Sequence, residues 1–389
     1  MRKGWEYKKL GEVGQIVTGS TPSTKDESNY SPKEYCFVKP SDLPSQGIAD
    51  IEETEYFVSQ VGLSKSRVLR AGSVLVSCIG SIGKIGILTK EACSNQQINA
   101  IIPQDETDSR FIAYSVYAQR FVLESIANAP VVPIINKTDF SKIRIGIPPK
   151  STQLAIVSEL DKINELIRLK KEQLKDFDNL AQSLFYEMFG DPMENEKGWE
   201  VKKLGEIGEF KNGLNFSKDE KGHSIKFLGV SDFQNKKSIA SDQLAYISLS
   251  ERVQEDYLLK TGDLVFVRSN GKKELIGRSV KMYITEPTTY SGFCIRCRIT
   301  DEKVDKDYIA ILLKTPIIRQ FMTNSGRGCN ISNLNQKILN SIPTILPPLP
   351  LQRLFAQRIE QIEREKSEVQ KSIQDLETLL ASRMQYWFE

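Results

Sequence analysis

The residues that could carry out chemistry in this chain are few, and their spacing argues against catalysis. Gly80-Ser81-Ile82-Gly83-Lys84 resembles a phosphate-binding loop. That motif needs glycine at position 78 and serine or threonine at position 85, where this chain has Cys78 and Ile85. We therefore reject a nucleotide site, and keep only a looser role in which the amides of this glycine-rich segment approach a DNA phosphate.

Metal and nucleophile chemistry is equally poorly supported. Cys294-x-x-Cys297 is half of a zinc pattern without a second pair, and in a strand its two side chains point to opposite faces, so strand packing is expected. His223 is the only histidine and lies in a polar stretch, where we expect a surface residue. One histidine excludes His-based metal sites and most Ser–His or Cys–His schemes. Nucleotide-binding glycine motifs, the adenine-methylation tetrapeptide and helicase motifs are missing from the sequence, so we predict no active site and no cofactor in this chain.

Composition sets the class of protein. The 389 residues suffice for two or three domains, and 53 basic against 50 acidic residues give a net charge of +3, which excludes a uniformly basic nucleic-acid binder but not local basic clusters. No apolar run reaches the ~18 residues of a membrane span, and the N-terminus does not resemble a signal peptide. Six scattered cysteines are expected to be free thiols in a reducing, cytoplasmic compartment.

Polar and basic loops are the strongest functional signal. Arginine and lysine can neutralise DNA phosphates, and arginine, asparagine and glutamine can pair with base edges in the major groove. For any single loop residue, plain solvation is the competing explanation. The set is more persuasive, because matching places in the two halves of the chain are polar yet differ in identity. The candidate DNA-binding residues are Thr18, Ser20, Thr21, Ser81, Lys84, Asn95, Gln96, Gln97, Asn136, Lys137, Lys211, Asn212, Arg268, Asn270, Lys272, Lys273, Arg327 and Asn330.

The two halves are revealed by an internal repeat. The segment 4–14 returns at 198–208 with nine of eleven positions identical, at an offset of 194. Weaker similarity continues at an offset of 190, for example between Leu69–Val74 and Leu259–Leu264. Each half ends in a Pro-Pro pair followed by about forty residues of different character. The order is therefore globular part, tail, globular part, tail.

The globular parts must position these loops, and both have mixed patterns. Strands are expected at 73–76, 98–102, 264–267 and 293–299, and helices at 110–127 and 307–322. Each part is therefore predicted to be α+β with a dominant sheet.

The tails are predicted to be a pair of long helices. Apolar residues recur with alternating spacings of four and three from Ile156 to Met188, and 199 residues later from Phe355 to Trp387, interrupted by Lys170, Lys366 and Arg383. Each helix would be ~60 Å long. Packing of each stripe on its own globular part is the alternative. If the helices pair, they must be antiparallel, with a pseudo-twofold relation, and Trp5 should lie near the end of the second helix as Trp199 follows the first.

This layout resembles the specificity subunit of Type I restriction–modification enzymes. The resemblance rests on the repeated Gly-Trp-Glu-x-Lys-Lys-Leu-Gly-Glu-x-Gly block, the Pro-Pro junctions with Gln153 and Gln352 shortly after, and the tails, and it covers essentially the whole chain. It implies two homologous mixed α/β target recognition domains, at 1–148 and 192–346. They would be joined by two long antiparallel α-helices (coiled coil) at 149–191 and 347–389, in an α+β fold.

The resemblance also implies a function. Each target recognition domain would read one half of a split site in double-stranded DNA, and the helices would set the spacer. Two methyltransferase subunits and two restriction–translocase subunits would be the partners, and AdoMet, ATP and Mg²⁺ would belong to them. The chain itself would be non-catalytic. The alternative is a two-domain coiled-coil scaffold that binds only protein.

Overall fold

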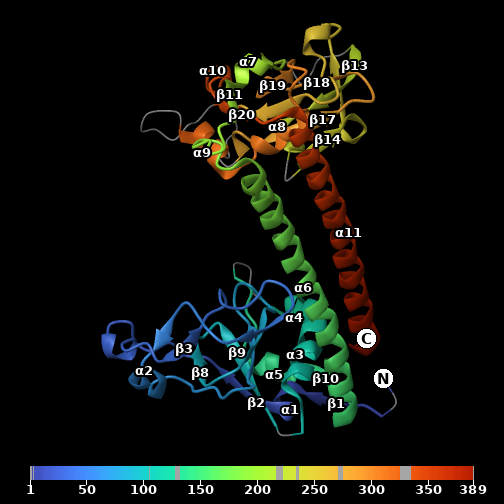
Figure 1. The fold of residues 1–389 in the computed structure, drawn as a ribbon. Helices are drawn as coiled ribbons and strands as arrows, with labels where there is room; N and C mark the ends of the chain where they lie inside the picture. Colours follow the sequence, from blue (N-terminus) through green and yellow to red (C-terminus); the bar gives the residue numbers. More distant parts are fainter. Residues whose placement is uncertain are drawn as a thin grey trace. The chain divides into compact units, whose positions relative to one another are not determined.

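The computed structural model describes residue 2 and residues 4–104, 106–127, 132–215, 222–233, 236–269, 275–324 and 334–388. The chain divides into two compact units, unit 1 with residues 1–172 and 370–389, and unit 2 with residues 173–369. Two 40-residue helices, α6 (Lys150–Phe189) and α11 (Leu349–Phe388), contribute to both units (Figure 1). Each unit therefore combines one copy of the repeat with one half of each long helix.

Unit 1 contains three sheets. The five-stranded sheet has the order β2 (Gly14–Thr18), β9 (Ile98–Pro103), β6 (Val74–Ser77), β7 (Ile85–Leu88) and β4 (Ile48–Ile51). The three-stranded sheet has the order β5 (Phe57–Val58), β3 (Tyr35–Val38) and β8 (Ala92–Ser94). A two-stranded ribbon pairs β1 (Glu6–Lys9) with β10 (Arg144–Ile147). The helices are α1 (Leu10–Val13), α2 (Gln60–Ser64), α3 (Ser109–Ala118), α4 (Arg120–Ile126) and α5 (Lys137–Lys142).

Unit 2 repeats this topology strand for strand. Its five-stranded sheet has the order β12 (Gly208–Asn212), β19 (Cys294–Ile299), β16 (Leu264–Val267), β17 (Ser279–Tyr283) and β14 (Ser238–Ala240). The other sheets are β15 (Tyr246–Leu249), β13 (His223–Leu228) and β18 (Thr288–Tyr290), and the ribbon β11 (Glu200–Lys203) with β20 (Pro343–Leu346). The helices are α7 (Leu204–Ile207), α8 (Lys306–Leu312), α9 (Pro316–Asn324) and α10 (Gln336–Asn340). Two homologous mixed α/β domains are therefore present, as the sequence predicts.

The predicted strands are found, but two predicted helices are each broken in two. The helix expected at 307–322 divides into α8 and α9, because Pro316 disfavours helical backbone in the residue before it and suits the first position of a new helix. The helix expected at 110–127 divides into α3 and α4 at Gln119, whose side chain donates to the Arg144 carbonyl (2.8 Å).

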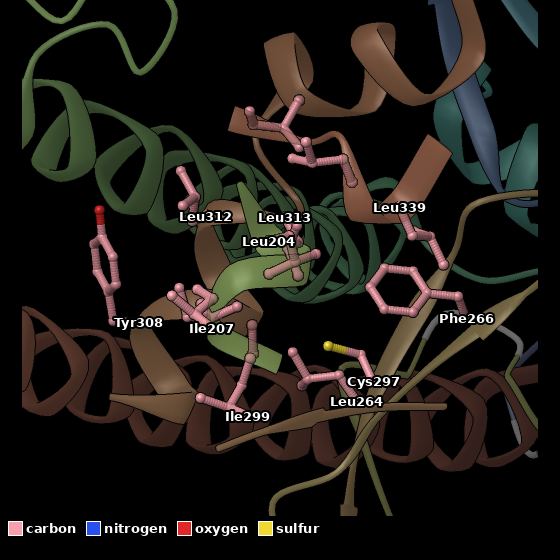
Figure 2. Close-up of a cluster of buried hydrophobic side chains, with 14 of the residues drawn as sticks. Leu204, Ile207, Leu264, Phe266, Cys297, Ile299, Tyr308, Leu312, Leu313 and Leu339 are labelled. Carbon is pink, nitrogen blue, oxygen red and sulfur yellow. The ribbon is translucent and has the colours of Figure 1, made fainter. Parts of the chain in front are cut away.

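The five-stranded sheet of unit 2 is covered on both faces, and Figure 2 shows part of one of them. Leu264, Phe266 and Cys297 lie in one buried cluster with Leu312, the last residue of α8, and Leu313, which follows it. On the opposite face, Val265, Val267 and Cys294 pack against residues of the three-stranded sheet. The core thus has three layers, and the loops at the strand ends are held by strands that are buried on both sides.

The repeated sequence block is held to each domain by a buried leucine and main-chain hydrogen bonds. Its leucine, Leu10 or Leu204, is fully buried, and its main-chain amide donates to Ile143 or Ile342. The glutamate two residues later accepts from the main-chain amide of the lysine before the leucine, which caps the short helix. The near-identity of the block therefore reflects a structural role.

The long helices run antiparallel in each unit. In unit 1, Arg383 of α11 pairs with Glu159 of α6, and Lys171 with Glu377 (2.8 Å). In unit 2, Lys366 of α11 pairs with Asp178 of α6, and Arg358 lies beside the Met188 sulfur (4.0 Å). In these pairs the residue number decreases along α6 as it increases along α11, which confirms the predicted antiparallel coiled coil.

The alternative of packing on the domain is also partly correct. Ile156 and Leu160 of α6 lie in one cluster with Phe111 of the unit 1 domain, and Phe355 of α11 lies in the core of unit 2. The stripe shifts by one residue near the ends of both helices, so that Met384 is buried where Arg383 was expected. A straight helix drifts relative to a strict heptad, and the domain contacts hold it in the drifted position.

The expected positions of the two repeated tryptophans are confirmed. Trp5 packs with Met384, Trp387 and Phe388 at the end of α11. The Trp199 indole donates to the carbonyl of Phe189 at the end of α6 (2.9 Å). Each domain is therefore tied to the last turn of the helix that arrives at it.

Candidate nucleic-acid interface

The candidate residues of unit 1 lie on loops that main-chain hydrogen bonds tie together. After β2, the amide of Gly19 donates to Ile98 O (3.0 Å) and that of Ser20 to Ser94 O (2.8 Å). Gly19 is required there, because a Cβ atom would come within 2.1 Å of Asn95 O. The loops at 18–21 and 95–97 are thereby placed side by side.

Two further bonds extend this arrangement to the other candidate loops of unit 1. The amide of Cys78 donates to Gln97 O (2.8 Å), and the amide of Ile135 donates to Cys78 O (2.9 Å). The chain then enters α5 at its cap residue Asn136. We call this series of bonds, from residue 19 through 97 and 78 to 135, the loop frame of unit 1.

Unit 2 contains the same loop frame with different side chains. Gly213 donates to Cys294 O (3.1 Å), and a Cβ atom on it would come within 2.2 Å of Ser291 O. The main-chain amide of Arg268 donates to Phe293 O (2.8 Å), and the main-chain carbonyl of Arg268 accepts from the amide of Leu334 (2.8 Å). Leu334 precedes the cap residue of α10. Arg268 therefore occupies in unit 2 the frame position that Cys78 occupies in unit 1.

The polar side chains on the unit 1 frame contact one another. Thr21 donates to Gln96 Oε1 and Thr18 to Asn99 Oδ1, both at 2.7 Å. Asn95, which is 7% exposed, donates to Gln97 Oε1 (2.8 Å) and so shapes its own loop. Thr21 and Gln96 are exposed and are the best placed of this group to meet a ligand.

Two other predicted residues of unit 1 stabilise the ends of the frame. Asn136 caps α5 by accepting from the amide of Asp139 (2.8 Å), and Lys137, in the first turn of this helix, is exposed. The predicted candidates at 18–21, 95–97 and 136–137 are therefore brought together.

The glycine-rich segment 80–84 is a turn between β6 and β7, and is followed by a strand instead of a helix. Gly80 and Gly83 have φ values of 76° and 79°, which suit glycine. Ser77 holds the turn by donating to Ser81 O and accepting from the amide of Lys84 (2.9 Å). The rejection of a nucleotide-binding loop is confirmed, since such a loop opens a helix. Lys84 donates through Nζ to Pro40 O (3.1 Å), and Ser81 is exposed.

In unit 2 the described candidate side chains differ in how many contacts they make within the protein. Lys211 pairs with Asp256 (2.9 Å) and lies over the Tyr257 ring (4.1 Å), and this lysine lowers the pKa of the Asp256 carboxyl. Asn212 accepts from Gln336 Nε2 (3.1 Å). Arg268 is half-buried on the frame. Asn270, Lys272, Lys273, Arg327 and Asn330 lie outside the described residues.

Two exposed side chains beside the frames were missed by the sequence analysis. Arg67 donates to Thr18 O (2.6 Å), and its amide donates to Ser20 Oγ (3.2 Å), so this exposed guanidinium lies next to the first candidate loop. It belongs to the polar, basic run Ser64–Arg67, which carries the same signal as the chosen loops. Phe293 is 59% exposed on the unit 2 frame and offers an aromatic face.

The cysteines and the histidine that could suggest catalysis have structural or surface positions. Cys294 and Cys297 point into opposite core layers, as predicted. The five described cysteines are free and buried, and burial raises the pKa of Cys78 to about 12, so it is not a thiolate near neutral pH. His223 is exposed, as expected, although it begins β13 instead of lying in a loop. Among the described residues, no group of three or more His, Cys, Asp or Glu side chains is placed to hold a metal ion.

Comparison with known families identifies the domains that contain the two loop frames. Residues 2–176 and 196–378 each match the Type I restriction modification DNA specificity domain. The chain belongs to this specificity family. The two matched segments correspond to the two copies of the repeat, so each frame lies within one DNA specificity domain.

Relatives cover nearly the whole chain. The Type I restriction enzyme MjaIX specificity subunit of Methanocaldococcus jannaschii is 24% identical over 97% of this chain and 91% of its own length. The EcoKI specificity subunit of Escherichia coli is 21% identical over 95% and 84%. The HindI specificity subunit of Haemophilus influenzae is 30% identical, over 52% of this chain and 40% of its own length.

Solved structures share the fold of this specificity-family member. The S subunit of a Type I restriction–modification system from M. genitalium has a TM-score of 0.56 at 14% identity, covering 99% of this chain and 96% of that one. A chain from a structural study of Type I system assembly has a TM-score of 0.65 at 18% identity, covering 99% and 97%. Within the described part of the chain, no helix is long and apolar enough to cross a membrane.

Proposed function

We propose that this chain selects the DNA sequence on which the other subunits of a Type I restriction–modification complex act. Each domain reads one half of a bipartite site in double-stranded DNA, using the side chains on its loop frame. The observation that carries this proposal is the repetition of one main-chain frame with different side chains. A cysteine occupies in unit 1 the place of an arginine in unit 2, which suits two related readers of different sequences.

The long helices fix the spacer between the two half-sites and offer a scaffold to the partners. Those partners are two methyltransferase subunits and two restriction–translocase subunits, which supply the chemistry and bind AdoMet, ATP and Mg²⁺. The chain itself is non-catalytic and acts in the cytoplasm. A protein-only scaffold is not favoured, because both matched segments are DNA specificity domains.

Methylation mapping tests the proposal directly. The full chain is co-expressed with the neighbouring methyltransferase gene, and N6-methyladenine is mapped by single-molecule sequencing of host DNA. Two short specific sequences around a fixed unspecified gap are expected. A continuous motif would argue against two readers, and an unmethylated genome despite a stable complex would argue for the protein-only scaffold.

The Arg268→Ala variant tests whether the two frames read separately. Arginine can bond guanine O6 and N7 together, so its loss should weaken recognition of one half-site by roughly 1–3 kcal/mol. Thr21→Ala, on the frame of the other domain, is the matched variant and should affect the other half-site. Equal effects of either variant on both half-sites would contradict separate reading.

The spacer role is tested by lengthening both helices together. One heptad inserted after Glu172 and another after Val369, where the two units meet in sequence, adds about 10 Å to each helix. That length corresponds to about three base pairs. The lengthened protein should select a longer gap in the methylation map, and unchanged selection of the original gap would refute the spacer role.

A further inference from the structure

The turn between β18 and β19 of unit 2 presents one exposed aromatic side chain (Figure 1). Phe293 is 59% exposed, whereas its chain neighbours Gly292 and Cys294 are buried. Its main chain is fixed on both sides, because its amide donates to Ser291 Oγ (3.2 Å) and its carbonyl accepts from the amide of Arg268 (2.8 Å). The phenyl ring is therefore held toward solvent by a turn whose backbone is bonded in place.

This ring lies beside the arginine that we expect to read a base. In the antiparallel pairing of β16 with β19, Val267 lies opposite Cys294. One step further along the same ladder, Arg268 lies opposite Phe293, and their main chains are hydrogen bonded. Residues that lie opposite each other point to the same face of a sheet, with Cβ atoms about 4.5–5.5 Å apart. Arg268 and Phe293 are therefore adjacent side chains at the end of the ladder.

The same turn in unit 1 has the same main-chain bonds and a different side chain. The amide of Gln97 donates to Asn95 Oδ1 (3.1 Å), which is the bond that Ser291 accepts in unit 2. Gln97 O accepts from the amide of Cys78 (2.8 Å). Gln97 is half-buried, and its Oε1 accepts from Asn95 Nδ2 (2.8 Å). A phenyl group in unit 2 thus occupies the frame position of an amide in unit 1, as expected where two readers of different sequences diverge.

The chemistry of a phenyl ring restricts what it can recognise. Single exposed apolar residues are common, so exposure alone does not indicate a ligand. Phe293 is distinguished by its fixed turn and by its place next to Arg268, whose pairing with guanine would occur in the major groove. A phenyl ring has no hydrogen-bonding group, and among the base edges of that groove its partner is the 5-methyl group of thymine. An aromatic wedge between base steps is less suitable, because such wedges enter through the minor groove.

We propose that Phe293 is a specificity-determining residue that recognises the 5-methyl group of one thymine in the unit 2 half-site. This proposal rests on the proposed function and adds the identity of one base to it. The separation of about 5 Å between the two side-chain origins compares with a rise of about 3.4 Å per base pair. The thymine should therefore lie within about two base pairs of the base that Arg268 contacts.

The first experiment removes the methyl group from the DNA. The full chain, in its complex with the methyltransferase, is titrated with duplexes that carry the bipartite motif from the methylation map. Each thymine of both half-sites is replaced in turn by 2′-deoxyuridine, which lacks only the 5-methyl group. One replacement should weaken binding of the wild type about fourfold, as expected for the loss of one buried methyl-sized group.

The second experiment repeats these titrations with variants of the ring. Phe293→Ala should bind the unmodified duplex about fourfold or more weakly than the wild type, and its affinity should no longer change when that methyl group is removed. Phe293→Leu keeps an apolar side chain and should keep part of the methyl dependence. Tyr246→Ala is the matched control, because Tyr246 is also exposed (58%) but bonds Glu286, which precedes the opposite end of β18. This control should keep the full methyl dependence.

The outcomes separate this proposal from the proposed function. A methyl effect at one thymine that is present in the wild type and lost in Phe293→Ala supports the proposal. The absence of a methyl effect at every thymine, or an effect of equal size in the wild type and Phe293→Ala, would overturn it while leaving the bipartite site intact. A wild-type complex that binds duplex without sequence preference would remove the proposed function, and the proposal with it.

Discussion

Two buried glutamines fix the direction in which each long helix leaves its domain, and their removal gives a sharp prediction. Gln153 is 2% exposed; its Oε1 accepts from the amide of Asp108 (3.0 Å) and its Nε2 donates to Pro148 O (3.0 Å). Gln352 is 1% exposed and forms the same bonds with Asp305 (2.8 Å) and Pro347 (2.7 Å). One side chain thus joins the start of the helix to the cap residue of α3 or α8.

Gln153→Met keeps the size of the side chain but leaves one donor and one acceptor without partners. A buried polar group without its partner costs about 1–3 kcal/mol, so two such groups should cost unit 1 about 2–6 kcal/mol of unfolding free energy. Gln352→Met should destabilise unit 2 by at least as much, because Gln352 also donates to Lys303 O (3.3 Å).

Urea unfolding combined with hydrogen exchange resolved by unit measures these losses. Gln153→Met should increase exchange in unit 1 and leave the unit 2 domain unchanged, and Gln352→Met should do the reverse. Leu154→Ala, at a half-exposed neighbouring position, is the control and should change stability by no more than about 0.5 kcal/mol. A loss of that small size in Gln153→Met, or equal losses in both units, would refute the reasoning.

Three further predictions concern single side chains. Gly213→Ala places a Cβ atom 2.2 Å from Ser291 O, so the unit 2 frame must shift, and methylation mapping should show weakened selection at one half-site only. The folded-state pKa of Lys314 is about 8 against its usual 10.5, so the unfolded chain binds more protons between these values and unfolding free energy rises with pH there. Lys314→Met should remove that rise, which is on the order of 3 kcal/mol, in urea midpoints measured across this range. Arg383 lowers the pKa of Glu159, so the ion pair stabilises unit 1 at neutral pH, and this stabilisation is lost as pH falls through the lowered pKa. Arg383→Gln should therefore make hydrogen exchange in unit 1 depend less on acid pH.

The architecture could be predicted from the sequence because it depends on repetition and periodicity. Nine identities in the repeated block and two stripes in one register predicted paired domains and antiparallel helices. The break before Pro316 could have been read from the proline itself, whereas the break at Gln119 depends on a contact with Arg144 that only the folded chain provides. The shift of the buried stripe to Met384 likewise depends on contacts with the domain.

The candidate interface was predictable in outline and not in detail. Polar loops at strand ends were recognised, and the frame brings those of unit 1 together. Residue type alone could not distinguish Asn136, whose side chain caps α5, from Gln96, whose side chain bonds the neighbouring loop at Thr21, because both are exposed amides in polar loops. A cavity in unit 2 brings together side chains from segments as far apart in sequence as Lys236 and Arg319, and no local pattern in the sequence indicates that they meet.

The loop frame has a consequence for how new specificities can arise. Its bonds join main-chain atoms, so the frame accepts a cysteine at position 78 and an arginine at position 268 without altering its own hydrogen bonds. The side chains on the frame can therefore be substituted while its main-chain hydrogen bonds stay the same, at little cost to folding. Since each unit has its own loop frame, one half of the recognised sequence can diverge while the other is inherited unchanged.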